Sequence, residues 1–314
     1  MKIGLVLSGG VAKGAYQAGF LRAVVDSGIV SSIGSISCAS IGLFSGYALS
    51  AGKVQKLYDI WQQIHFDSFA DLTYEVWFKH YLKELMAEFI RTDDMLRIPV
   101  YAPICYVLPF IRMEYCKLYG EYIKTWSKFI LGATSYPFIS GGIHFFRGQI
   151  TFDGGAMDNI PVFPLIEFER PDLILILHFE SGYRPRRKYL LSGIPVFDFD
   201  ISIADKFRKH SFDFHSDTLQ ARLKHGYEYG GELINNLFGG CKASIEEVCA
   251  AAQRQRESET DRRLDGATFE TWVQRLNEIF YPYVSQFKIK MRDLSVHGGV
   301  TRLRLNKEVQ RYVN

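Results

Sequence analysis

Residues 33–46 have the sequence Ile-Gly-Ser-Ile-Ser-Cys-Ala-Ser-Ile-Gly-Leu-Phe-Ser-Gly. Its β-branched start predicts a short strand over residues 33–37, and the small residues that follow predict a tight turn and then a helix over 41–50. A serine at such a corner is pushed outward by strained backbone, so that its hydroxyl can attack a carbonyl carbon. Ser40 is therefore the candidate nucleophile.

The sizes of the residues around Ser40 favour this register. The positions two before and two after a nucleophile at such a corner should be small, and here they are Cys38 and Gly42. Taking Cys38 or Ser45 as the nucleophile would place larger side chains at these positions. An ordinary strand–helix turn made of small residues is the alternative interpretation of this stretch.

A glycine-rich loop, Gly9-Gly-Val-Ala-Lys-Gly14, lies between an apolar strand predicted over 3–7 and a helix predicted over 14–26. Backbone amides in a loop at a helix N-terminus can bind the oxyanion that forms during acyl transfer. We therefore expect an oxyanion hole made by the backbone amides of Gly9, Gly10 and Val11.

Other functions of glycine-rich loops do not fit this sequence. In a P-loop a lysine follows the last glycine, whereas Lys13 precedes Gly14. A dinucleotide-binding loop needs glycine where this chain has Val11. A valine keeps its amide, so it suits an oxyanion hole provided that its φ is negative, as is usual for a β-branched residue.

A third motif, Asp153-Gly-Gly155, follows a strand predicted over 149–152. Aspartate and glycine are also common in ordinary β-turns, which is the alternative interpretation. A carboxylate at this strand end could face the Ser40 hydroxyl and act as its base. Because the usual aspartate pKa is near 4, the group would need apolar surroundings to work at neutral pH. The aromatic-rich segment 54–126 could supply them, as core or as an acyl-chain cleft.

The three motifs, in this order, resemble those of the patatin-like phospholipase family, bacterial type. The resemblance covers residues 3–166 and includes the flanking stretches Lys13-Gly-Ala-Tyr-Gln-Ala-Gly19 and Asp158-Asn-Ile-Pro-Val162. It implies a lipid acyl hydrolase, a serine esterase of phospholipase A type, that uses a Ser40–Asp153 dyad, forms a covalent acyl-enzyme and needs no metal or cofactor. The other motif positions are Lys13, Gly14, Cys38, Gly42, Gly154 and Gly155.

The chain departs from the family pattern at two positions. Val11 stands where the family usually has a third glycine, and Cys38 replaces the first glycine of the serine motif. These departures leave open a catalytically degenerate lipid-binding or protein-interaction module. An acyltransferase on the same fold, in which an alcohol replaces water in the second step, is a second alternative that the sequence does not separate from a hydrolase. A Ser–His–Asp hydrolase is a further alternative, with His178 as the best-placed histidine.

The order of the predicted elements indicates an α/β fold, a three-layer α/β/α arrangement around a mostly parallel sheet. The apolar run 173–179 is typical of a central parallel strand. We expect a catalytic core over 3–166, the remainder of the α/β domain over 167–238, and a helical, basic extension over 239–314. The extension should hold helices near 244–259 and 268–280 and a basic tail.

Composition limits the possible partners of this 314-residue chain. A net charge of +3 is too small to indicate nucleic acid, and five scattered cysteines without a paired spacing predict neither a disulfide framework nor a zinc site. We expect a cytoplasmic protein or one peripheral to a membrane, without signal peptide or membrane span. The basic stretch Arg184-Pro-Arg-Arg-Lys188 could attract anionic lipid headgroups.

Overall fold

The computed structural model describes residues 1–64, 89–107, 110–122, 124–135, 144–180, 182–202, 211, 213–239, 244–260 and 290–293. Its strands are β1 (Ile3–Leu7), β2 (Ile33–Cys38), β3 (Met95–Tyr106), β4 (Arg112–Glu121), β5 (His144–Phe146), β6 (Gln149–Asp153), β7 (Leu173–His178), β8 (Val196–Asp200) and β9 (Lys290–Asp293). Its helices are α1 (Gly14–Asp26), α2 (Gly42–Ala51), α3 (Val54–Gln63), α6 (Thr125–Ala133), α7 (Arg187–Leu190), α8 (Ser216–Phe238) and α9 (Ile245–Thr260).

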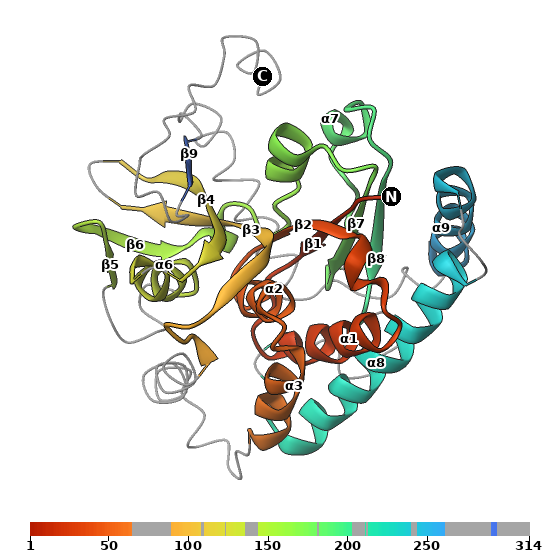
Figure 1. Ribbon diagram of the computed structural model, residues 1–314, viewed down its shortest axis with the longest axis horizontal. Helices are drawn as coiled ribbons and strands as arrows, with labels where there is room; N and C mark the ends of the chain where they lie inside the picture. Colours follow the sequence, from red (N-terminus) through yellow and green to blue (C-terminus); the bar gives the residue numbers. More distant parts are fainter. Residues whose placement is uncertain are drawn as a thin grey trace.

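All described strands belong to one mixed sheet with the order β5-β6-β3-β2-β1-β7-β8, in which β4 also pairs with β3, and β9 with β4 (Figure 1). Strands β3, β2, β1, β7 and β8 run parallel to one another, whereas β4 and β6 are antiparallel to β3. Helices α1, α2, α3 and α8 lie on one side of the sheet, and α7 lies on the other (Figure 1). The predicted α/β fold is confirmed.

Most elements of the first half occur where the sequence predicts them, but the segment after α3 differs. Strand β3 covers Met95–Tyr106 there, and the antiparallel β4 that pairs with it was not expected. Pro99 lies where the β3–β4 register shifts, between Leu96 and Val100. A proline has no amide to donate to a ladder, so it is found at such irregularities of a sheet.

Alternating residues of the central strands face two separate apolar clusters. Leu5 and Leu7 of β1 contribute to the larger cluster, under α1, α2 and α8, whereas Val6 belongs to the smaller cluster on the opposite face. The smaller cluster is covered by the segment after Asp153, including the single π-helical turn Leu165–Glu169. Each central strand is thus buried on both faces, as predicted for parallel strands.

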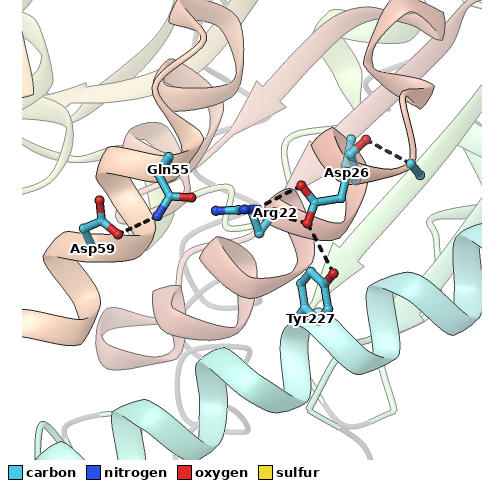
Figure 2. Close-up of polar contacts among 7 residues, drawn as sticks. Arg22, Asp26, Gln55, Asp59 and Tyr227 are labelled. Carbon is cyan, nitrogen blue, oxygen red and sulfur yellow. Dashed lines mark hydrogen bonds and ion pairs between the residues drawn. The ribbon is translucent and has the colours of Figure 1, made fainter.

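Helices α1 and α8 pack in close contact, since a Cβ on Gly19 would lie 2.0 Å from the Leu223 carbonyl oxygen and one on Gly226 would lie 2.1 Å from that of Tyr16. Polar contacts at the surface complete this packing (Figure 2). The Tyr227 hydroxyl of α8 donates to Asp26 of α1 at 3.2 Å, and Arg22 pairs with the same carboxylate at 3.0 Å. On the neighbouring α3, Gln55 donates to Asp59 at 2.6 Å (Figure 2).

Helix α9 is fixed to the sheet by an ion pair. Arg256 Nη2 lies 2.8 Å from Oδ1 of Asp198, a fully buried residue of β8, while Val248 and Ala252 of α9 pack in the larger apolar cluster. This helix agrees with the one predicted over 244–259. The other helix predicted at 268–280 and most of the basic tail lie outside the described residues, as do residues 65–88 of the aromatic segment.

Candidate active site

Ser40 lies at the corner between β2 and α2, as the sequence predicts. Its φ is 53°, in the left-handed region that residues other than glycine rarely adopt. The residue is 8 % exposed, at the carboxyl end of the parallel strands, where ligands of open α/β sheets usually bind. The strained serine corner is therefore present.

The contacts of Gly42 and Cys38 explain why both residues at the serine corner are small. A Cβ on Gly42 would lie 2.7 Å from the Leu7 carbonyl oxygen, so the end of β1, rather than Cys38, excludes a side chain there. The Cys38 thiol donates to the Tyr101 carbonyl at 3.4 Å and lies against Gly46. Burial raises the pKa of this thiol, which keeps it protonated and argues against it as a nucleophile.

Asp153 is the last residue of β6 and is fully buried. Its Oδ1 accepts a hydrogen bond of 2.7 Å from the Gly155 amide, and its own amide donates to the Ser135 carbonyl at 2.7 Å. A Cβ on Gly154 would lie 2.3 Å from the Pro103 carbonyl oxygen of β3, so glycine is required where the chain turns. These contacts fix the carboxyl group at the strand end.

Burial raises the pKa of Asp153 from 3.8 to about 7, although hydrogen bonding from the Ser40 hydroxyl and the Gly155 amide lowers it. The Ser40 hydroxyl is thus near the carboxyl group, but among the described residues Oδ2 has no partner that meets the geometry of an ordinary hydrogen bond. Such contacts are often long in a resting site and shorten when substrate binds. The structure therefore brings together the two residues predicted to form the dyad.

The glycine loop also lies beside Ser40, since a Cβ on Gly9 would be 2.8 Å from the Cβ of Ser40. The Gly9 amide donates to Asn159 Oδ1 at 3.1 Å, which leaves it occupied, contrary to our expectation for an oxyanion donor. Among the residues that the structure describes, the amides of Gly10 and Val11 donate no hydrogen bond. Two of the three expected amides therefore remain available.

Val11 differs from the expectation of a negative φ, because its φ is 52°. The left-handed region is costly for a β-branched residue and is usually occupied by glycine. At Val11 the loop thus has a backbone conformation that a glycine would adopt without steric cost.

Lys13 and Gly14 close the loop against its surroundings. The Lys13 amide donates to the Gly10 carbonyl at 2.9 Å, and its buried ammonium lies 5.8 Å from the centre of the Phe179 ring. A Cβ on Gly10 would lie 2.5 Å from the same ring, and one on Gly14 would lie 2.7 Å from Trp61. These contacts agree with a role for Lys13 in fixing the loop.

Asn159 joins the loop to the aspartate turn, a role that the three motifs do not predict. Besides accepting from the Gly9 amide, its side chain donates to Glu180 Oε1 at 2.9 Å and to the Gly9 carbonyl at 3.4 Å. Its Oδ1 would lie 3.1 Å from a Cβ on Gly155. The flanking stretch Asp158-Asn-Ile-Pro-Val162 was the signal available in the sequence.

His178 lies at the end of β7 but faces away from this chemistry. Its Nδ1 accepts from the Glu180 amide at 3.1 Å, and its Nε2 lies 3.6 Å from Asp198 Oδ2, on the side anchored to α9. No described contact joins it to Ser40. The geometry therefore gives no support to a Ser–His–Asp arrangement.

The basic stretch 184–188 is partly engaged with the second carboxylate of this region. Burial raises the pKa of Asp158, while Arg186 and Lys188 lower it, and the Tyr115 hydroxyl donates to its Oδ2.

Within the described ranges, no three His, Cys, Asp or Glu side chains are grouped so that they could hold a metal ion. None of the described helices combines the length and the apolar character that crossing a bilayer requires.

Comparison with known proteins gives only a distant likeness. No protein-family model matches the chain, and no curated protein matches it. Among solved structures, the crystal structure of VipD from Legionella pneumophila matches over 90 % of this chain and 80 % of that chain, with 13 % identity and a TM-score of 0.36. A likeness this low carries no argument about function, so the interpretation of the site rests on the geometry of its own residues.

Proposed function

We propose that this chain is a serine acyl hydrolase that cleaves fatty-acyl esters of phospholipids. The observation that carries the proposal is the buried Asp153 carboxyl, with a pKa of about 7, near the hydroxyl of a serine held at φ 53°. A pKa near neutrality suits a general base at physiological pH. The lipid as substrate comes from the resemblance of the three motifs to those of patatin-like phospholipases.

In the proposed first step, Asp153 takes the proton of the Ser40 hydroxyl as its oxygen attacks the ester carbonyl carbon. The carbonyl oxygen gains negative charge and is bound by the amides of Gly10 and Val11. The alcohol part of the lipid leaves with the proton from Asp153, and the acyl group stays on Ser40 as an ester. Water then gives a proton to Asp153 as it attacks the carbonyl carbon of this ester. The bond to the Ser40 oxygen breaks, that oxygen takes the proton from Asp153, and the fatty acid is released.

Mutation of the dyad tests the proposal. Fatty-acid release from a panel of mixed phospholipids should fall by roughly 10⁴-fold or more in Ser40→Ala and in Asp153→Asn. Ser45→Ala is the matched control, because Ser45 is a buried serine in the first turns of α2 and should keep activity. Circular dichroism of each variant shows whether the fold is kept.

A fluorophosphonate probe separates the remaining alternatives. A hydrolase or an acyltransferase should be labelled at Ser40, and product analysis with added alcohols distinguishes these two. A wild-type protein that releases no fatty acid and resists the probe would contradict the proposal. The lipid-binding or interaction module would then be the better interpretation.

A further inference from the structure

Two neighbouring hairpin tips expose large apolar side chains beyond the candidate dyad. Phe110 and Ile111, in the connection between β3 and β4, are 70 % and 38 % exposed, and Phe145 of β5 is 57 % exposed. Arg147, in the turn between β5 and β6, is exposed as well. We refer to Phe110, Ile111, Phe145 and Arg147 as the tip surface.

The pairing of the strands places both tips at the same end of the sheet. The Val107 amide, just after β3, donates to the Ile150 carbonyl of β6 at 3.1 Å, and Ile150 pairs with Phe145. The Arg112 side chain, at the start of β4, donates to Gln149 at the start of β6. The members of the tip surface therefore belong to adjacent hairpins.

This end of the sheet is the end at which the dyad lies. Asp153 pairs with Ile104, and β6 runs from there back to Ile150, three residues away. At a rise of about 3.3 Å per residue, the tips begin about 10 Å from Asp153, at the amino end of β6. A surface that covered the tips would thus face the end of the sheet at which Ser40 lies.

The charge of the tips is of one sign. Residues 106–112 and 144–150 include Arg112 and Arg147 and contain no acidic residue. The Arg147 guanidinium lies 5.1 Å from the centre of the buried Phe146 ring, and that of Arg112 lies 4.5 Å from the ring of Tyr106. Exposed aromatic rings with adjacent arginines suit the interface of a bilayer that contains anionic lipids.

We propose that the tip surface docks this protein on an anionic phospholipid bilayer, with Phe110 and Phe145 inserted at the level of the headgroups. The inference deepens the proposed function, on which its biological meaning rests, because docking there would bring Ser40 to the lipid esters. Within the part of the chain that the structure describes, the other exposed large apolar residues do not have this relation to the site. Leu190 and Leu191 precede β8, at the amino end of the parallel strands, where α7 lies close to the chain's N-terminus (Figure 1).

Co-sedimentation with vesicles tests the proposal without reference to activity. All proteins carry Ser40→Ala, so that the vesicles are not consumed, and the vesicles are phosphatidylcholine with or without phosphatidylglycerol. The Phe110→Ser/Phe145→Ser double variant should bind roughly tenfold more weakly, because two exposed rings lose apolar area buried in the bilayer. Arg147→Gln should weaken binding about fivefold on the anionic vesicles and leave binding to pure phosphatidylcholine unchanged.

Leu190→Ser/Leu191→Ser is the matched control, since these side chains are 51 % and 73 % exposed and should not affect vesicle binding. With Ser40 intact, the tip variants should keep their rate on a soluble short-chain ester. Equal vesicle binding by the tip double variant and the parent would overturn the proposal. A tip variant that changed only self-association in sedimentation velocity would also overturn it, and would assign the surface to a second copy of the chain.

Discussion

Val11 and Ser40 have nearly the same unusual backbone conformation, with φ values of 52° and 53°. The first belongs to the glycine loop and the second to the serine corner, and the loop lies beside that corner. At Ser40 the strain is what presents the hydroxyl, whereas at Val11 a glycine would adopt the same conformation without cost. Strain at the two positions therefore has different consequences for stability and function.

Replacing Val11 by glycine should relieve backbone strain. We expect the free energy of unfolding of Val11→Gly to exceed that of Val11→Ala by about 1 kcal/mol, because both variants lose the valine side chain but only glycine tolerates positive φ. Urea denaturation of the two variants measures this difference. Equal stability, or a more stable Val11→Ala, would mean that Val11 carries no strain.

The raised pKa of Asp153 predicts the pH dependence of stability. The folded protein binds this proton up to about pH 7, whereas the unfolded chain releases it near pH 4, so the free energy of unfolding falls as pH rises through this window and is level above it. Asp153→Asn does not titrate at this position. Relative to this variant, the free energy of unfolding of the wild type should fall by up to about 4 kcal/mol between about pH 4 and pH 7. Denaturation curves at several pH values test this, and parallel curves for both proteins would contradict it.

The same ionisation should control activity. Only the ionised Asp153 accepts the Ser40 proton, so kcat/KM for a soluble ester should increase with pH through about 7 and then level off. The profile measures the pKa in the free enzyme. A rate that did not change through this range would argue against Asp153 as the base.

Asn159 is predicted to act as a positioning residue for the glycine loop. Asn159→Ala removes the hydrogen bonds to Gly9 and Glu180 and should lower kcat about tenfold or more with little change in KM, since the loop amides would no longer be held for the oxyanion. Asn236→Ala is the control, because this exposed asparagine of α8 makes a similar side-chain bond to Gln255, in α9. An increase in KM alone would instead indicate a role in substrate binding.

Substitution by alanine should have opposite effects on stability at Gly42, where α2 approaches the end of β1, and at Gly231, where space is open. Gly42→Ala should lower the free energy of unfolding by about 2 kcal/mol or more, because its Cβ would lie 2.7 Å and 2.9 Å from the carbonyl oxygens of Leu7 and Ser8. Gly231→Ala, in α8 with no atom within 4 Å of the new Cβ, should raise it by about 0.5–1 kcal/mol. Thermal denaturation of both variants tests this prediction. It would be contradicted if both substitutions raised, or both lowered, the stability of the protein.

The local parts of this structure could be predicted from the sequence because short motifs specify them. Ser40 and the glycine loop each follow a short apolar strand, and the parallel strands β1 and β2 bring their carboxyl ends together. Asp153 ends β6, which is antiparallel to β3, so its position near Ser40 depends on a pairing with Ile104 that the local sequence does not specify. The antiparallel β4 and the bridge made by Asn159 depend on contacts between residues distant in the sequence. The positive φ of Val11 opposes its own preference, so only the closure of the loop in the folded chain could reveal it.

Helix α9 has a consequence for how this protein behaves beside other chains. Val248 and Ala252 pack with the cluster on one face of the sheet, while Arg256 reaches Asp198, whose strand neighbour Ile176 belongs to the cluster on the other face. The helix therefore lies beside β8, the last strand in the described order of the sheet (Figure 1). An edge strand with unpaired backbone N–H and C=O groups can pair with a strand of another molecule. Because α9 covers this edge of the sheet, it protects β8 from such aggregation.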